Sequence, residues 1–175
     1  MKKIILIGYM GSGKSVAAQI LHEKLQIKLA DLDREIEQKS DRTISRIFSQ
    51  KGEIHFRKLE SMVLAELIKE DIPMIISLGG GTPCYANNLD IIRQSDATTF
   101  YLKASAQTLA HRLSNETSSR PLISTIGHEN LPEFINKHLF ERSPFYLQAD
   151  HIIQTDDKTP LQIADEIISI VSILT

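Results

Sequence analysis

Apolar runs along the chain alternate with segments whose apolar residues recur at helical spacing. Short, continuously apolar runs bounded by turn residues are typical of strands buried on both faces of a parallel sheet. The sequence contains five such runs, at residues 3–7, 27–33, 74–78, 97–102 and 151–155. We expect each of them to form a strand of one sheet.

Helical periodicity fills the stretches between these runs. The segment Lys14–Leu25 has four apolar residues close to helical spacing: Val16, Ile20, Leu21 and Leu25. The segment 53–70 has a similar apolar face: Leu59, Val63, Leu64 and Leu67. Further helices are expected over residues 44–52, 87–94, 105–113, 133–144 (ending at Pro144) and 160–174.

Strands that alternate with helices predict a parallel sheet covered by helices on both faces. The chain of 175 residues has the length of one domain. Ligands of such sheets bind at the carboxyl ends of the strands, where this sequence places a glycine-rich loop, two aspartates and three consecutive glycines. The polar stretch after residue 113 contains Gly and Pro and is long for a connection, so we expect a functional lid over residues 114–128.

Composition and charge narrow the class of partner. The sequence is 42% hydrophobic and 24% charged, as in folded soluble proteins, and its 20 basic residues nearly balance its 22 acidic ones. Because this balance gives no bulk attraction to nucleic acid or to a membrane, we expect neither as a partner. The single cysteine, Cys84, permits no disulfide within the sequence, and no apolar stretch reaches membrane-spanning length. We therefore expect a cytoplasmic protein.

The stretch GYMGSGKS at residues 8–15 matches the pattern G-x-x-x-x-G-K-[ST] between a strand and a helix. In this motif backbone N–H groups surround the phosphates of a nucleoside triphosphate, the lysine reaches the outer phosphates, and the hydroxyl holds Mg²⁺. The alternative is a chance glycine-rich turn, which the flanking strand and helix disfavour. We expect nucleotide contacts from Gly11, Ser12, Gly13, Lys14, Ser15 and Val16.

The motif does not identify the group that receives the phosphate. A small GTPase needs a guanine-reading segment of the N-K-x-D kind, and the nearest string, NKHL at residues 136–139, lacks the aspartate. Motor ATPases place an acidic residue after an apolar strand, whereas runs 74–78 and 97–102 are followed by glycine and lysine. Transfer to a small acceptor is therefore the leading class.

Asp31 and Asp33 end the second apolar run, beside the glycine-rich loop in the expected sheet. One carboxylate can complete the Mg²⁺ shell, directly or through water, and the other can take the proton of an attacking hydroxyl. A helix N-cap with an acidic first turn explains the same pattern. The neighbouring phosphate loop favours the functional interpretation.

Arg57 and Arg142 have apolar sequence neighbours, unlike arginines on a solvated face. Two guanidinium groups in one cleft can bind a carboxylate, although composition alone favours surface or helix-pairing arginines. Glu60, three residues after Arg57, can orient that arginine through an i, i+3 pair.

Gly79, Gly80 and Gly81 follow the third run directly, and we interpret them as backbone lying against the substrate, with a plain tight turn as the alternative. Arg120 lies in the expected lid. There it can stabilise the oxygens of the transferring phosphoryl group while water is excluded, or it can be a solvated loop charge.

The segments GYMGSGKS, DLD, GEIHFR, GGGTP, RPLI and ERSPFY, in this order and at these spacings, resemble shikimate kinases over nearly the whole chain. The resemblance implies a three-layer α/β sandwich of the P-loop NTPase type, with a five-stranded parallel sheet in the order 2-3-1-4-5 and a lid. It implies one domain, 1–175, with a substrate-binding segment at residues 32–60. The implied reaction moves the γ-phosphate of ATP to the 3-hydroxyl of shikimate, in the route to chorismate and the aromatic amino acids.

The resemblance also implies roles for single residues. Asp33 would contact the reacting hydroxyl and act as the base, assisted by Lys14 and by the lid arginine, Arg120. Ser15 would bind Mg²⁺ directly and Asp31 through water. Arg112 would pack on the adenine. The implied shikimate contacts are Asp33, Arg57, Gly79, Gly80, Gly81 and Arg142. The family also implies a monomer.

Two other classes remain open at this level. One is a P-loop kinase for another small acceptor, such as gluconate or a nucleoside monophosphate. The other is a non-catalytic nucleotide-binding module that regulates a partner. The arginine pair favours a carboxylate acceptor, and a binding module needs neither a base nor a lid arginine.

Overall fold

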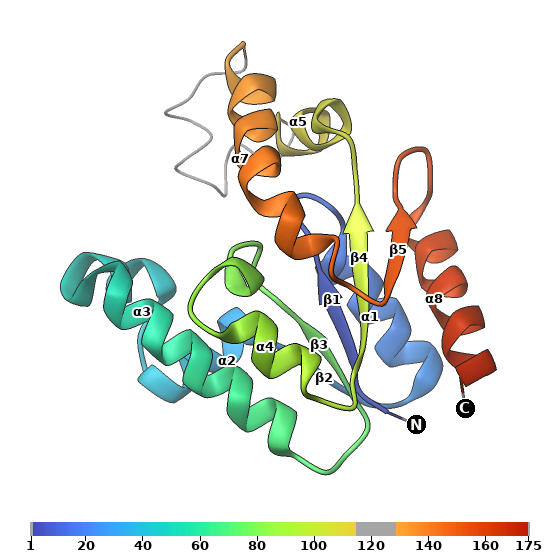
Figure 1. The fold of residues 1–175 in the computed structure, drawn as a ribbon, viewed down its shortest axis with the longest axis horizontal. Helices are drawn as coiled ribbons and strands as arrows, with labels where there is room; N and C mark the ends of the chain where they lie inside the picture. Colours follow the sequence, from blue (N-terminus) through green and yellow to red (C-terminus); the bar gives the residue numbers. More distant parts are fainter. Residues whose placement is uncertain (1, 115–128, 175) are drawn as a thin grey trace.

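The computed structural model describes residues 2–114 and 129–174, which form a three-layer α/β sandwich (Figure 1). One sheet of five parallel strands lies in the middle, in the order β2-β3-β1-β4-β5, which confirms the order that the resemblance implied. The strands are β1 (Ile4–Ile7), β2 (Lys28–Asp31), β3 (Met74–Ser77), β4 (Thr98–Lys103) and β5 (His151–Gln154).

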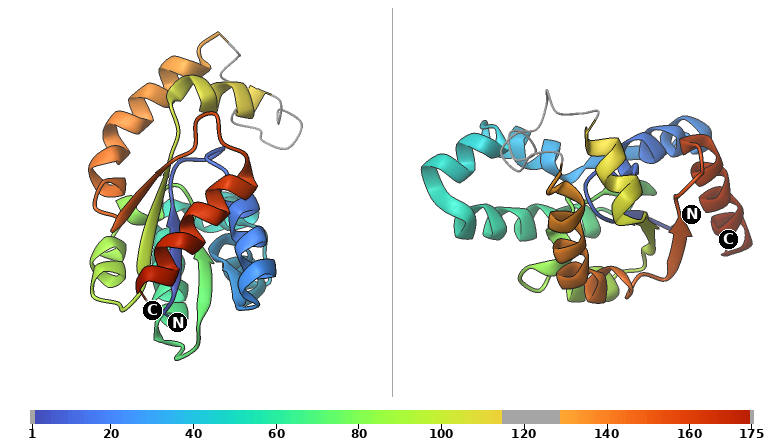
Figure 2. Two further views of the ribbon diagram at one scale, coloured as in Figure 1. Left: turned by 90° about the vertical axis from the view of Figure 1, so that its right-hand side faces the viewer. Right: turned by 90° about the horizontal axis from the view of Figure 1, so that it is seen from above.

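Helices cover both faces of this sheet. One face carries α1 (Lys14–Leu25) and α8 (Pro160–Leu174), which lie side by side in the left view of Figure 2. The helical elements of the other layer, and those above the sheet in Figure 1, are α2 (Leu32–Ser40), α3 (Ile44–Lys69), the 3₁₀ turn η1 (Thr82–Cys84), α4 (Asn88–Arg93), α5 (Ala106–Ser114) and α7 (Leu131–Tyr146).

Alternate residues of the central strand β1 point into different layers. Ile5 and Ile7 belong to the apolar cluster beneath α2, α3 and α7, whereas Ile4 and Leu6 belong to the cluster beneath α1 and α8. All four side chains are at most 2% exposed. A strand whose two faces are both covered needs no polar alternation, which explains the continuous apolar runs of the sequence.

Two features of the helices differ from the sequence expectation, and a third agrees with it. On α1, Val16 is 53% exposed, and the apolar part of the buried face is formed by Ala17, Ala18 and Leu21, of which only Leu21 belongs to the expected apolar set. The helix α7 continues past Pro144 to Tyr146. A proline two residues before a helix end removes a single backbone hydrogen bond, so the last turn survives. The two expected helices over 44–52 and 53–70 are both present within α3, which kinks between them at Gly52, where the backbone is not helical (φ 78° and ψ 172°).

Within the described ranges, 2–114 and 129–174, the helices are too short or too polar to cross a membrane. The expected lid begins at Ser114, the last residue of α5. Its remaining residues, including Arg120, lie outside the described residues.

Candidate active site

The glycine-rich loop connects β1 to α1 and leaves the start of α1 open. Gly8 is required sterically, because a Cβ atom there would lie 2.7 Å from the Leu102 carbonyl oxygen. Gly13 has φ 95°, and a Cβ atom there would have no neighbouring atom within 4 Å. In the described part of the chain, no side chain caps α1. An open, uncapped helix N-terminus presents unpaired N–H groups and a positive dipole end. This geometry suits a phosphate group.

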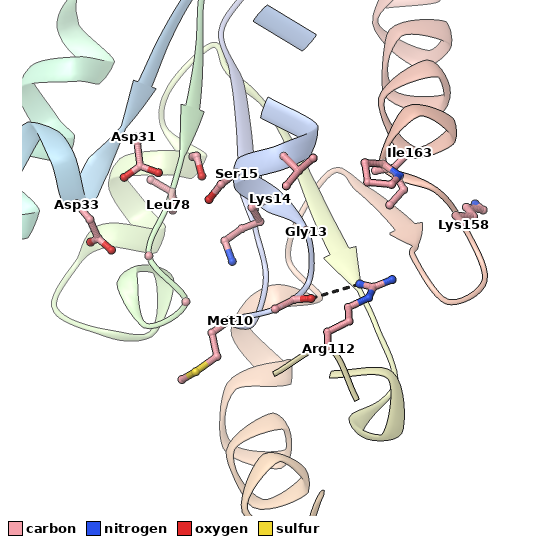
Figure 3. Close-up of a pocket in the computed structure, with 16 residues that line it drawn as sticks. Met10, Gly13, Lys14, Ser15, Asp31, Asp33, Leu78, Arg112, Lys158 and Ile163 are labelled. Atoms are coloured by element: carbon pink, nitrogen blue, oxygen red, sulfur yellow. Dashed lines mark hydrogen bonds between the residues drawn. The ribbon is translucent and has the colours of Figure 1, made fainter. Parts of the chain in front are cut away.

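Lys14 lies inside the loop and is only 8% exposed. Its Nζ donates hydrogen bonds to the carbonyl oxygens of Gly8 at 2.7 Å and Tyr9 at 3.0 Å. Figure 3 shows the ammonium between the aspartates on one side and Arg112 on the other. The positive charge therefore stands at the centre of the site.

A cleft of about 660 Å³ opens over this loop at the carboxyl ends of the strands. Its walls include ten of the residues that we expected from the sequence: Gly11, Gly13, Lys14, Ser15, Val16, Asp31, Asp33, Gly79, Gly80 and Arg112. Ser12 is not among them: its side chain is 1% exposed and its N–H donates to Tyr9 O at 3.1 Å, which closes a turn within the loop. Arg57, Gly81 and Arg142 also lie outside these walls.

Asp31 and Asp33 adopt the geometry of both sequence interpretations at once. Asp31 is the N-cap of α2, where its carboxylate accepts from Arg34 N–H at 3.3 Å, and Asp33 lies in the first turn of α2 instead of in the strand. Both carboxylates also line the cleft. Capping of α2 by Asp31 therefore positions both carboxylates in the cleft, and it is compatible with a role for them in the site.

The surroundings of Asp33 make its carboxyl group an unusually weak acid. Burial and the negative charges of Asp31 and Glu60 raise its pKa to about 6, although the charge of Lys14 lowers it. A carboxylate with this pKa accepts a proton more readily than a solvated aspartate does. The group suits a general base at neutral pH.

The donors around the cleft fit Mg²⁺ better than a metal held mainly by protein. Among the described residues no group of three or more His, Cys, Asp or Glu side chains could hold a metal ion. Ser15 and Asp31 nevertheless place a hydroxyl and a carboxylate in one cleft with the open start of α1. Mg²⁺ commonly takes one or two protein oxygens and completes its shell with phosphates and water. These residues therefore fit a Mg²⁺–nucleotide complex.

Arg57 extends from α3 toward the three consecutive glycines. Its Nη1 donates to Glu60 at 2.9 Å, and its Nε and Nη2 lie 3.3 Å from Glu53, so the helix-pairing alternative describes part of its environment. Burial alone would lower the Arg57 pKa, but the hydrogen bond and charge of Glu60 raise it. The guanidinium is thus held charged and in one place.

The glycine turn closes directly against this arginine. A Cβ atom on Gly81 would lie 3.2 Å from Arg57 Nη2, and the Arg57 guanidinium carbon stands 3.8 Å from the centre of the Tyr85 ring. A Cβ on Gly79 would lie 3.3 Å from Asp33 Oδ1. The glycines therefore give close backbone approach and a tight turn together, since Thr82 N–H also donates to Gly79 O at 3.1 Å.

Arg142 reaches the same region from α7. Its guanidinium carbon lies 5.5 Å from the centre of the Tyr9 ring. Burial raises the pKa of the Cys84 thiol to about 11, and the charges of Arg142 and Arg57 both lower it. The positive charges of both guanidinium groups thus act on the same thiol, at the end of η1, which is compatible with their facing one anionic group.

Arg112 joins the glycine-rich loop to the end of β5. Its Nη2 donates to Thr155 O at 2.8 Å and its Nη1 to Gly11 O at 3.3 Å. The cleft beside it is also lined by Lys158, Pro160 and Ile163, which the sequence interpretation did not include. Their signal was available: they lie in the loop and the first helical turn after the fifth expected strand, at the sheet edge where ligands bind. Met10, Ser77 and Leu78 were likewise missed.

These features define a P-loop kinase: a phosphate loop with a central lysine, a carboxylate of raised pKa in the same cleft, and two arginines beside it. A family model described as shikimate kinase matches residues 10–172. The chain belongs to the shikimate kinase family.

Individual relatives agree with this assignment. The chain is 46% identical to a shikimate kinase from Flavobacterium johnsoniae over 172 residues, which are 98% of this chain and all of the relative. A crystal structure of shikimate kinase from Bacteroides thetaiotaomicron superimposes with a TM-score of 0.88 at 32% identity, covering 99% of this chain and 98% of the other. The shikimate kinase from Acinetobacter baumannii in complex with shikimate gives a TM-score of 0.86 at 30% identity, covering 98% and 93%.

Proposed function

We propose that this protein transfers the γ-phosphoryl group of ATP to the 3-hydroxyl of shikimate, giving shikimate 3-phosphate and ADP, in the biosynthesis of chorismate and the aromatic amino acids. The observation that carries the proposal is that one cleft joins Lys14, at the centre of the phosphate loop, to Asp33, a carboxylate with a pKa of about 6. Membership of the shikimate kinase family supplies the donor and the acceptor.

In this proposal the phosphate loop and Lys14 position and neutralise the outer phosphates of ATP. Asp33 accepts the proton of the acceptor hydroxyl while the oxygen of that hydroxyl forms a bond to the γ-phosphorus. The bond from that phosphorus to the oxygen of the β-phosphate breaks and releases ADP. Charge separates phosphate binding from proton transfer. Lys14 attracts the phosphates, whereas the negative charges near Asp33 raise the affinity of its carboxylate for a proton.

Arg57 and Arg142 bind the carboxylate of the acceptor, and Gly79, Gly80 and Gly81 contact its ring through their backbone. Support comes from the charges of both guanidinium groups, which act on the Cys84 thiol, and from the position of Arg57, so close to Gly81 that a Cβ atom there would lie 3.2 Å from it. The Tyr146 hydroxyl donates to Gly80 O at 2.5 Å, which fixes the turn. The complex of the Acinetobacter baumannii enzyme with shikimate is consistent with this type of acceptor.

Ser15 would hold Mg²⁺ directly, and Asp31 would hold it through water. When bound, the ion neutralises negative charge on the phosphate oxygens.

Arg112 packs on the adenine, and Arg120 acts from a lid over residues 114–128. We further propose that residues 32–60 form the substrate-binding segment, and that the protein is a cytoplasmic monomer without nucleic-acid or membrane partners.

The test is ADP release by the purified protein with Mg-ATP, in the presence of shikimate, quinate, gluconate or AMP and with no acceptor. Strong release with shikimate alone is the expected result, and EDTA in excess of Mg²⁺ should abolish it. Equal release with gluconate or AMP, or equal slow release with no acceptor, would overturn the acceptor assignment. Light scattering on a sizing column tests the monomer.

A further inference from the structure

Tyr9 of the glycine-rich loop has a buried side chain that no step of the proposed reaction uses. It is 1% exposed, and its hydroxyl lies 2.9 Å from His138 Nδ1 on α7. Its ring faces the Arg142 guanidinium at 5.5 Å, and its carbonyl oxygen accepts from Lys14 Nζ at 3.0 Å. One residue thus contacts the lysine of the phosphate loop and an arginine of the proposed acceptor site.

The partners of Tyr9 on α7 are spaced by one helical turn. His138 and Arg142 are four residues apart, so their side chains lie on the same face of the helix. Tyr9 spans this turn, because its hydroxyl reaches His138 and its ring lies beneath Arg142. Phe134, one turn earlier, packs against the His138 ring with a centroid separation of 4.2 Å and restricts its movement.

We propose that His138 is a positioning residue for acceptor binding: it holds the Tyr9 hydroxyl so that the Tyr9 ring fixes Arg142 for the acceptor carboxylate. The proposal rests on the role of Arg142 in the proposed function. An arginine side chain has many rotamers, and confining it before binding reduces the entropy lost when the carboxylate binds. The aromatic face also attracts the guanidinium directly.

The protonation of both groups is compatible with this hydrogen bond. Burial and the positive charge of Arg142 lower the pKa of His138, and burial raises the pKa of Tyr9 to about 12. At neutral pH the pair is therefore a neutral imidazole and an intact phenol. Such a pair shares one hydrogen bond with either group as the donor.

The test is a double-mutant cycle on the full-length protein, with Tyr9→Phe, His138→Phe and the combined variant. Both single substitutions keep an aromatic ring and remove one partner of the hydrogen bond. We expect each to raise KM for shikimate by about three- to tenfold, the range that one hydrogen bond supports, while KM for ATP and kcat stay within about twofold. The combined variant should resemble either single variant, because each removes the same interaction.

Rescue and control variants separate positioning from general packing. His138→Asn places an amide atom near the position of Nδ1 and should restore most of the shikimate affinity. Lys137→Ala, an exposed neighbour on α7, should leave both KM values unchanged. Far-UV circular dichroism verifies that each variant folds.

Three results would overturn the role of His138: multiplied effects in the combined variant, an equal rise of both KM values, or an unchanged KM for shikimate. Turnover of shikimate by the wild-type protein in the same assay tests the proposed function separately. An active wild type with unaffected variants would refute the positioning role alone.

Discussion

Arg57 and Glu60 form a partly buried ion pair: Arg57 Nη1 donates to Glu60 Oε2 at 2.9 Å, and the side chains of Arg57 and Glu60 are 19% and 1% exposed. The second carboxylate oxygen of Glu60 accepts from the Thr82 hydroxyl at 2.7 Å. Because Thr82 directly follows the three consecutive glycines, this carboxylate joins the α3 arginine to the turn that borders the cleft. The i, i+3 pair expected from the sequence is confirmed, and the structure adds a hydrogen bond from the turn to the same carboxylate.

Loss of the Glu60 charge should affect both stability and acceptor binding. In Glu60→Gln the buried side of Arg57 loses its counter-charge, and we expect the free energy of unfolding to fall by roughly 2–4 kcal/mol. KM for shikimate should rise because Arg57 is less fixed. Urea denaturation and steady-state kinetics measure the two effects. The matched control is Glu53→Gln, which removes the other, 54% exposed partner of Arg57 and should change stability by less than about 1 kcal/mol. Equal losses in the two variants would contradict the argument.

Asp33→Asn should separate nucleotide binding from transfer. The amide cannot accept the hydroxyl proton, so we expect kcat to fall by about 10²–10⁴-fold, with the dissociation constant of ATP nearly unchanged. Calorimetric titration of ATP and the ADP-release assay give the two numbers. Asp41→Asn, at the opposite end of α2 with φ 51°, is a matched control, since asparagine tolerates this conformation. Full activity of Asp33→Asn would remove Asp33 from the base role.

Gly81→Ala should weaken acceptor binding by displacing Arg57. The added Cβ would lie 3.2 and 3.3 Å from the two terminal nitrogens of Arg57, whereas φ −89° and ψ −18° suit alanine without backbone strain. We expect KM for shikimate to rise by about tenfold and KM for ATP to change little, for a cost of about 1.4 kcal/mol in acceptor binding. If the effect acts through Arg57, the same substitution in an Arg57→Ala background should add almost nothing. A full additional rise there would point to a different cause.

Cys84 should react slowly with thiol reagents and in a characteristic pH-dependent way. Burial raises its pKa to about 11, and a raised pKa means that the reactive thiolate is scarce below that pH. At pH 8 only about one thiol in a thousand is ionised. The alkylation rate by iodoacetamide, followed by mass spectrometry, should rise about tenfold per pH unit from 8 to 10. A rate that levels off near pH 9 would show an ordinary thiol. Shikimate should slow the reaction, because the arginines beside Cys84 would then hold the acceptor.

The sequence determined the features of this protein that depend on neighbouring residues. The helices Lys14–Leu25 and Pro160–Leu174 have the predicted bounds, and the five apolar runs correspond to the five strands of the sheet. Apolar periodicity and proline or glycine at element ends are local signals, and burial of both sheet faces keeps the strand signal strong. The phosphate loop was visible for the same reason, since its residues are contiguous.

Only the tertiary structure decided how side chains from distant segments meet. Arg112 is anchored to Thr155, and Tyr9 contacts His138 from 129 positions away. No local pattern encodes such contacts, because they depend on how α5 and α7 pack above the sheet. The exposure of Val16 was decided in the same way. The sequence thus specified the elements and the phosphate loop, while packing between layers set the geometry of the acceptor side of the cleft.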